Sequence, residues 1–401
     1  MAMSSRSEAA APMRRISPAV RVGAFFGAYF AANAVNAFMP LWFADRGLTA
    51  AQIGQVLSAA ALLRVLAGPA WGSVADWIGR RRPVLLFAAA VASGLGLSYV
   101  LASSFAVILL IAAVQGLAAS AINPLTDSLA LALARQGRIE YGPVRSVGSA
   151  AFMLTTAASG WLLARAGSSL VPWLQATGYG IAATLSLTLP EVATGRVAPN
   201  LASAVELFRI PGFRLALACT ALIQGAHAAF YGFAALYWRS QGISDTVIGL
   251  LLAECIVAEV LLFARGRRLI GWLGPAGLTA CAASASIVRW TLTAFALPVP
   301  VMALIQPLHA ATFAMQHLSA MLLLSRFVPP DRAATAQAVH SALGYGAPTG
   351  LMMLVAGWLY AREGGLVFLL MAASGGAALL LVRPLRRILA AAREGTGTVQ
   401  A

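Results

Sequence analysis

Arg289 is the residue whose type and position say most about the chemistry of this chain. It is the only formally charged residue between Arg268 and Arg326, and it lies near the middle of an apolar stretch from Pro275 to Pro298. An unpaired guanidinium at the centre of a bilayer costs about 3 kcal/mol on insertion scales. A chain that keeps such a group needs it for ion pairing, substrate binding or proton coupling.

Two acidic residues, Glu254 and Glu259, lie in the preceding apolar stretch. They are five residues apart, which is about 140° around an α-helix, so they cannot both face one cavity squarely. A buried carboxylate with a displaceable cationic partner is suited to carry a proton. The alternative is a static ion pair between Glu259 and Arg289 that holds two helices together. The residues alone leave open which acid would carry the proton.

Histidines supply the next candidates. His309 and His317 are eight residues apart, about 80° around a helix, with Phe313 on much the same side. Gln224 and His227, three residues apart, form a similar stripe in an earlier apolar stretch. Such stripes either line a cavity or make single hydrogen bonds between helices. None of these histidines has another at the i, i+4 spacing of metal ligands, so we expect no metal site.

Polar residues in apolar stretches of the first half are further candidates. Facing lipid would be costly for Arg64, Asn33 and Asn36, so we expect them to face a cavity. An organic carboxylate needs a cation, and a guanidinium offers it a bidentate fork, so Arg64 and Arg289 are the two candidates for binding one. Four aromatic residues either contact a substrate ring or pack between helices: Phe230, Tyr231, Trp290 and Phe313.

Composition places these residues in a membrane. The chain of 401 residues is 60% hydrophobic and only 10% charged, which ordinary soluble domains do not match. Apolar runs long enough to cross about 30 Å of hydrocarbon recur throughout. We predict twelve, near residues 18–43, 51–75, 83–102, 105–130, 141–164, 170–190, 212–238, 245–264, 275–297, 299–324, 333–360 and 365–384.

The distribution of basic residues predicts the topology. All 28 are arginines, and the net charge is +15. With both termini in the cytoplasm, 22 arginines fall on the cytoplasmic side and four on the other, namely Arg46, Arg165, Arg239 and Arg362. This is the positive-inside pattern of membrane proteins, so the charge sets topology and does not indicate nucleic-acid binding.

The longest connection divides the chain into two halves. We predict a cytoplasmic tail at 1–17, a six-helix bundle at 18–190, a cytoplasmic loop at 191–211, a second six-helix bundle at 212–385 and a cytoplasmic tail at 386–401. Repeats of this kind are common in secondary transporters, whose substrate site lies between the halves. No phosphate-binding loop of the form G-x-x-x-x-G-K-[ST] occurs, so we expect neither ATP nor another cofactor.

The connection between the second and third predicted spans carries a recognisable pattern. Its residues resemble the signature loop G-x-x-x-D-x-x-G-[RK]-[RK]-[RK] of the major facilitator superfamily. Asp76 lies at a helix C-terminus, where the macrodipole disfavours an anion, so it needs a cationic partner and is placed to act as a latch between conformations. The alternative is a topology anchor made of arginines and a turn. The gating candidates are Gly72, Asp76, Gly79, Arg80, Arg81 and Arg82.

Further segments carry a closer resemblance. They are Tyr141–Ser149, Gln224–Phe233, Val257–Val260, Val288–Trp290, Leu308–His309 and His317–Met321. Together they resemble the 3-phenylpropionate permease family, proton-linked members of the superfamily related to lactose permease. The resemblance implies symport of a proton with an aromatic or other small organic acid.

The resemblance also implies roles for particular residues. The acid of the family matches Glu259, which is then the proton carrier or the partner of Arg289. His309 and His317 are further proton-coupling candidates because they lie in the same half as this acid and Arg289. Asp127 and Arg145 flank a short connection and are positioned to pair. By analogy with the acid–arginine pair of lactose permease, they bind substrate or contribute to coupling; the alternative is that they staple two helices.

The expected architecture is an all-α integral membrane protein of the major facilitator fold, with twelve transmembrane helices in two six-helix bundles and both termini cytoplasmic. We expect a monomer in a bacterial inner membrane, working by alternating access, with a small-molecule substrate, protons and the lipid bilayer as partners. The alternative is a proton-coupled drug or metabolite exporter, because the fold does not set direction. An intramembrane enzyme is remote, since neither H-E-x-x-H nor G-x-S-x-G occurs.

Overall fold

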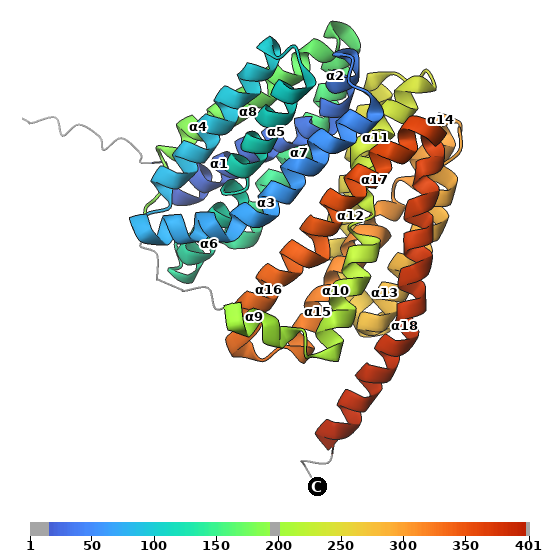
Figure 1. Cartoon of the computed structure of the whole chain (residues 1–401). Coiled ribbons are helices and arrows are strands. Elements are labelled where there is room, and N and C mark those ends of the chain that lie inside the picture. The colour runs from blue at the N-terminus through green and yellow to red at the C-terminus, as the bar shows by residue number, and fades with distance from the viewer. Residues whose placement is uncertain (1–15, 193–200, 398–401) are drawn as a thin grey trace, which may run out of the picture.

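The computed structural model of the chain describes residues 16–192 and 201–397 (Figure 1). Within these ranges every regular element is helical, which confirms the all-α class. The predicted N-terminal tail through residue 15, residues 193–200 of the predicted central loop and residues 398–401 of the predicted C-terminal tail lie outside the described residues.

The helices fall on either side of residue 200. The first set is α1 Pro18–Val35, α2 Met39–Asp45, α3 Ala50–Ile78, α4 Arg82–Ser98, α5 Phe105–Ala119, α6 Ile122–Arg135, α7 Tyr141–Ala166 and α8 Val171–Ser186. The second set is α9 Leu201–Leu207, α10 Pro211–Ile223, α11 His227–Ser240, α12 Asp245–Ala264, α13 Gly266–Thr293, α14 Val299–Ile305, α15 Gln316–Phe327, α16 Ala333–Val339, α17 Ala347–Glu363 and α18 Val367–Gly397. Two π-helices, η4 Ala310–Met315 and η6 His340–Gly346, continue into α15 and α17.

Local sequence sets where several helices begin and end. Thr49 and Gln52 form a capping box at the start of α3, in which the Gln52 N–H donates to Thr49 Oγ1 at 3.3 Å and the Thr49 N–H donates to Gln52 Oε1 at 2.9 Å. Ser244 caps α12 through its hydroxyl. Gly79 ends α3 at a φ of 73°, which residues with side chains rarely adopt. These caps fix the points at which the chain turns between helices.

Nine helical segments of the described residues are long and apolar enough to cross a membrane. Each of the twelve predicted stretches is helical, but α8 has only 16 residues. The stretch at 299–324 is interrupted between α14 and η4, and the last two stretches run together across the short turn Gly364–Leu366. The number of twelve membrane spans therefore stays a prediction.

Two segments predicted as a connecting loop and a tail contain helix. The predicted loop at 191–211 contains α9, which packs on α16. The predicted tail from residue 386 is part of α18, which passes through Pro384 without ending. Leu385 and Leu389 are buried there against Phe213 of α10 and its neighbours, so packing keeps this segment helical past the proline.

The helices gather into two halves, α1–α8 and α9–α18 (Figure 1). The halves meet along two helix pairs, α3 against α17 and α7 against α12. We call the end that contains the turns at residues 46–49 and 241–244 the arginine-poor end, and the end that contains Arg80–Arg82 the arginine-rich end. At the arginine-rich end, α6 packs on α1, α4, α5 and α7, and α16 packs on α9 and α15, each within its own half.

Glycines let the backbones touch where the halves meet. A Cβ added to Gly54 of α3 would lie 2.9 Å from the Cα atom of Gly357 in α17. A Cβ added to Gly160 of α7 would lie 2.9 Å from the Cα atom of Gly249 in α12. Such contacts leave no room for a side chain. All four glycines lie toward the arginine-poor end, so the interface is closed there.

An ion pair between the halves lies at the same end, and the other ion pairs of the described residues stay within one half. Arg239 of α11 donates to Asp245 of α12 from Nε at 2.9 Å and from Nη2 at 2.7 Å. Its Nη1 lies 3.1 Å from Oδ2 of Asp45, at the end of α2. The Ser168 hydroxyl donates to the same carboxylate. This ion pair joins the halves where the glycines let them approach.

We expect Gly160→Val to open the arginine-poor end, because a side chain there meets the backbone of α12. Spin labels on cysteines introduced at Arg46 and Ser240, measured by pulsed electron paramagnetic resonance, should show a larger population at long distance. Cys281 is replaced by alanine first, because Cys219 and Cys255 are buried and it is not. The control is Gly94→Val, where an added Cβ meets nothing within 4 Å. An equal distance distribution in both variants would contradict a glycine-dependent closure.

Candidate functional site

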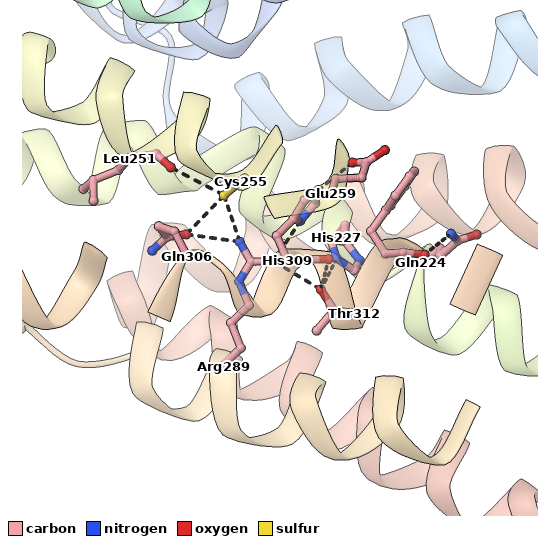
Figure 2. Close-up of polar contacts among 10 residues, drawn as sticks. Gln224, His227, Leu251, Cys255, Glu259, Arg289, Gln306, His309 and Thr312 are labelled. Atoms are coloured by element: carbon pink, nitrogen blue, oxygen red, sulfur yellow. Dashed lines mark hydrogen bonds and ion pairs between the residues drawn. The ribbon is translucent and has the colours of Figure 1, made fainter. Parts of the chain in front are cut away.

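The guanidinium of Arg289, on α13, is completely buried and is surrounded by neutral acceptors (Figure 2). Its Nη1 donates to His309 Nδ1 at 2.9 Å and to Thr312 Oγ1 at 3.2 Å. Its Nη2 donates to Gln306 Oε1 at 3.1 Å and to Cys255 Sγ at 3.4 Å. Among the described residues, Nε has no partner and no carboxylate lies within ion-pair distance. Arg289 is therefore a buried cation whose hydrogen-bond partners among the described residues are all neutral.

Two aromatic rings complete the surroundings of this cation. The Cζ atom of Arg289 lies 4.2 Å from the ring centroid of Trp290 and 4.7 Å from that of Phe230. A cation over an aromatic face gains about 2 kcal/mol when both are desolvated. Both rings are buried, so the structure assigns Trp290 to packing against Arg289 in this conformation.

The proton positions on His309 follow from the chemistry of arginine. A guanidinium only donates hydrogen bonds, so His309 Nδ1 must accept and the proton of the neutral ring is on Nε2. Nε2 lies 3.5 Å from Oε2 of Glu259, on α12. The direct ion pair between Glu259 and Arg289 is not formed; His309 lies between them and links the acid to the buried cation.

His227 and Gln224 are used in contacts between helices. His227 Nδ1 donates to the carbonyl of Ile223 at 2.8 Å, which leaves Nε2 to accept from the Thr312 hydroxyl at 3.0 Å. Gln224 Nε2 donates to the carbonyl of Phe313 at 3.1 Å. Both side chains are buried and contact η4 in this structure, and their part in substrate binding stays a prediction.

The π-helix η4 determines how this site is arranged. Pro307 follows α14, and the wider turns of Ala310–Met315 follow His309. The α-helical spacing that relates His309 to His317 by about 80° does not hold across a π-helix. His309 is buried and stacks on Phe313 with ring centroids 5.4 Å apart. His317 is half-buried and lies against Phe263, near enough to Glu259 for an electrostatic interaction.

His340 belongs to the same half but was not among the sequence candidates. It begins the second π-helix, is buried, and its Nε2 lies 3.0 Å from the hydroxyl of Thr220 on α10. Gln316 Nε2 donates to the same hydroxyl at 3.2 Å. Gln337 lies three residues before His340, the spacing that relates Gln224 to His227, and this signal could have singled it out.

In the first half, the predicted asparagines belong to a chain of side-chain amides. Asn36 Nδ2 donates to Asn33 Oδ1 at 2.9 Å, and Gln175 of α8 donates to Asn36 Oδ1. Gln115 of α5 donates to Gln175 Oε1 and to the carbonyl of Ala92, both at 2.9 Å. Asn33 and Asn36 are half-buried, and the two buried glutamines anchor them; whether the asparagines face a cavity stays a prediction.

Asp127 and Arg145 lie together as their positions predicted. Arg145 Nε is 3.6 Å from Asp127 Oδ1, and the Tyr141 hydroxyl donates to the same oxygen at 3.0 Å. The Arg145 guanidinium also lies over the ring of Phe30, with Cζ 4.2 Å from the centroid. Whether this pair binds substrate or staples α6 to α7 stays a prediction.

The arginines of the loop after α3 hold the segment that follows α8. Arg80 Nε lies 3.1 Å from Glu191 Oε2, and Arg81 Nη1 donates to the carbonyl of Val192 at 3.4 Å. Asp76, one turn before Gly79, is near enough to Arg81 to interact electrostatically. The predicted latch residue thus has a cation nearby, within its own half.

Arg64 is exposed and lies midway along α3. It forms no ion pair or hydrogen bond with the described part of the chain, in contrast to Arg289. The two cations proposed for a substrate carboxylate therefore differ: one is completely covered and the other is open to solvent.

Comparisons with known proteins agree with this fold. A model of the MFS_1 like family matches residues 21–370. The probable 3-phenylpropionic acid transporter of Escherichia coli (strain K12) is 29% identical over 362 residues, which are 87% of this chain and 92% of that protein. The maltose permease of Geobacillus stearothermophilus is 28% identical over 342 residues, which are 84% of this chain and 86% of that protein.

Solved structures of transporters share the arrangement of helices. The nucleoside transporter NupG matches with a TM-score of 0.79 at 15% identity, over 93% of this chain and 99% of that one. A D-xylose-proton symporter matches with a TM-score of 0.70 at 17% identity, over 91% of this chain and 96% of that one. At these identities the likeness establishes the fold alone.

We expect Thr312→Val to lower the free energy of unfolding by about 1–3 kcal/mol, because it leaves a guanidinium N–H and His227 Nε2 without partners. Thermal unfolding in detergent measures the effect. The matched control is Thr349→Val, since the buried hydroxyl of Thr349 has no hydrogen-bond partner among the described residues. That substitution should leave the melting temperature unchanged or raise it. Equal losses in both variants would contradict a supporting role for Thr312.

Proposed function

The chain belongs to the MFS_1-like family, and we propose from that premise that it carries a small organic acid into the bacterial cytoplasm together with a proton. Its relatives are transporters of small molecules, so the chain is a multi-pass membrane transporter of this kind. Proton coupling, the acidic substrate, the inward direction, the inner membrane and the monomeric state are parts of the proposal.

The link from Glu259 through His309 to Arg289 carries the proposal. The side chain of Glu259 is 21% exposed and that of His309 is 2% exposed, so the acid is the member that solvent reaches. His309 cannot take a second proton without breaking its hydrogen bond to Arg289, because Nδ1 is its only free position. A proton that arrives therefore stays on Glu259, whose carboxylate is near enough to His317 and to Arg145 of the other half for electrostatic interaction.

The arrangement of the halves supports alternating access. The interface is closed at the arginine-poor end, where the paired glycines pack and Arg239 pairs with Asp45. If the positive-inside rule holds, the arginine-rich end lies in the cytoplasm and the structure corresponds to an inward-facing state. Glu259 would then exchange its proton with the cytoplasm in this state and with the opposite side after the halves rock.

The choice of an acid as substrate rests on the intramembrane cations and on the aromatic side chains near them. Tyr231 is 36% exposed, and Phe313 and Tyr345 lie beside each other with ring centroids 6.4 Å apart. The likeness to a probable 3-phenylpropionic acid transporter supports an aromatic acid. The nearly equal likeness to a maltose permease means that identity alone does not select the substrate.

We expect Glu259→Gln to abolish accumulation driven by a pH gradient while retaining exchange of substrate across the membrane, because the amide mimics the protonated acid. The protein is reconstituted into liposomes, and uptake of labelled 3-phenylpropionate, benzoate and a sugar is followed with and without an imposed gradient. Extrusion of the acids under the same gradient would contradict the inward direction.

The control is Glu254→Gln, an acid on the same helix that has no hydrogen bond or ion pair within the described part of the chain. It should accumulate substrate like the unchanged protein. Undiminished pH-driven accumulation by the Glu259 variant, or its loss only in the Glu254 variant, would contradict Glu259 as the proton carrier.

A further inference from the structure

Arg64 faces the other half of the molecule. Leu57, seven residues before it, shares its face of α3, since seven residues are about two turns. A Cβ added to Gly232 of α11 would lie 3.2 Å from Leu57 Cδ1, so this face points across the interface. Leu66, about 200° around the helix from Arg64, is 72% exposed and lies on the outer side.

Solvent reaches Arg64 although its face points inward. Arg64 is exposed, whereas Val65, its neighbour in the chain, contacts Gly346 of the other half. The interface is therefore packed around α3 but open at the guanidinium. Arg64 is therefore a cation midway along a long membrane helix, and the described residues supply no acidic partner for it.

Aromatic groups from both halves surround this position. The guanidinium is near enough to the hydroxyls of Tyr29, Tyr179 and Tyr345 for electrostatic interaction. Tyr345 belongs to the other half and touches Phe313, which stacks on His309. Aromatic surface therefore extends from Arg64 toward the histidine that contacts Glu259.

Arg289 is not accessible to a substrate carboxylate in this structure. Four of its N–H groups are used by neutral acceptors, its Cζ lies over two buried rings, and the residue is 0% exposed. A carboxylate would have to displace His309 or Gln306 to reach it, and that would break the link to Glu259.

We infer that Arg64, and not Arg289, binds the carboxylate of the substrate, and that the site selects a monocarboxylate with an aromatic or other apolar body. Arg64 is then the specificity-determining residue, and Arg289 positions the proton-carrying pair. The inference rests on the proposed function in taking the substrate to be an acid.

Equilibrium binding tests this assignment without transport. The full-length protein in lipid nanodiscs is titrated with 3-phenylpropionate, benzoate and their neutral amides, using calorimetry. The unchanged protein should bind at least one acid about tenfold or more tightly than its amide, since a charge-assisted pair is worth at least that much. Arg64→Gln should remove this preference, Arg64→Lys should keep part of it, and Arg289→Lys should keep it. Amides bound as well as acids, or no binding of either, would overturn the inference.

The melting temperature of the variants distinguishes a binding role of Arg64 from a structural one. Removing a cation that lacks a counter-charge should leave the melting temperature of Arg64→Gln unchanged or higher, whereas loss of a structural contact would lower it. Arg362→Gln, at the arginine-poor end, is the control for removing an exposed arginine and should bind like the unchanged protein. Retained acid preference in Arg64→Gln with its loss in Arg289→Lys would assign the carboxylate to Arg289.

Proton coupling through Glu259 and carboxylate binding at Arg64 can be refuted independently of each other. If Glu259→Gln accumulates substrate under a pH gradient while Arg64→Gln has lost the acid preference, proton coupling through Glu259 is wrong and the carboxylate site stands. If Glu259→Gln loses coupled uptake while Arg64→Gln binds acids as before, the carboxylate site is wrong and the coupling stands.

Discussion

Burial of a guanidinium without a carboxylate is the constraint on which the C-terminal half depends. Arg289 draws its acceptors from α12, from the break after α14 and from η4, so these segments can move only together or by giving up hydrogen bonds to a buried charge. Because arginine donates and never accepts, it also orders the protons of His309 and directs the imidazole N–H toward Glu259. One side chain thus fixes both the packing and the protonation pattern of the site.

The two halves carry different polar and charged groups. The first half presents asparagines anchored by glutamines, the Asp127–Arg145 pair and an uncovered Arg64, while the second half encloses its own cation. An enclosed cation and an open one suit different purposes, since the first can hold a fixed network and the second can exchange partners. Substrate and proton would then act on opposite faces of one interface, through groups that do not compete for the same contacts.

Much of this could be predicted from the sequence, because membrane helices depend mainly on length and hydropathy. Arg289, Glu259 and His309 fell on neighbouring stretches, so their proximity was predictable, but the place of His309 between the other two was not. The π-helix at Ala310–Met315 changes the register of side chains, and no residue pattern in the sequence predicts it. The contact of His340 with Thr220 was not predictable, because the two are 120 residues apart, a distance that local spacing cannot bridge. The continuation of α18 past Pro384 likewise depends on packing against α10.

Arg239 contacts a carboxylate of its own half through two hydrogen bonds and one of the opposite half through a single ion pair. When the halves part, Arg239 keeps Asp245, and Asp45 loses Arg239 but keeps the Ser168 hydroxyl. The Asp45 side chain is already 53% exposed, and exposed pairs of this kind are worth about 0–1 kcal/mol, so water replaces the lost contact at little cost. Arg239 therefore pairs with Asp45 in the closed geometry but contributes little to its stability. This ion pair therefore adds little to the free-energy difference between the access states, so it does not oppose a ligand that favours the open one.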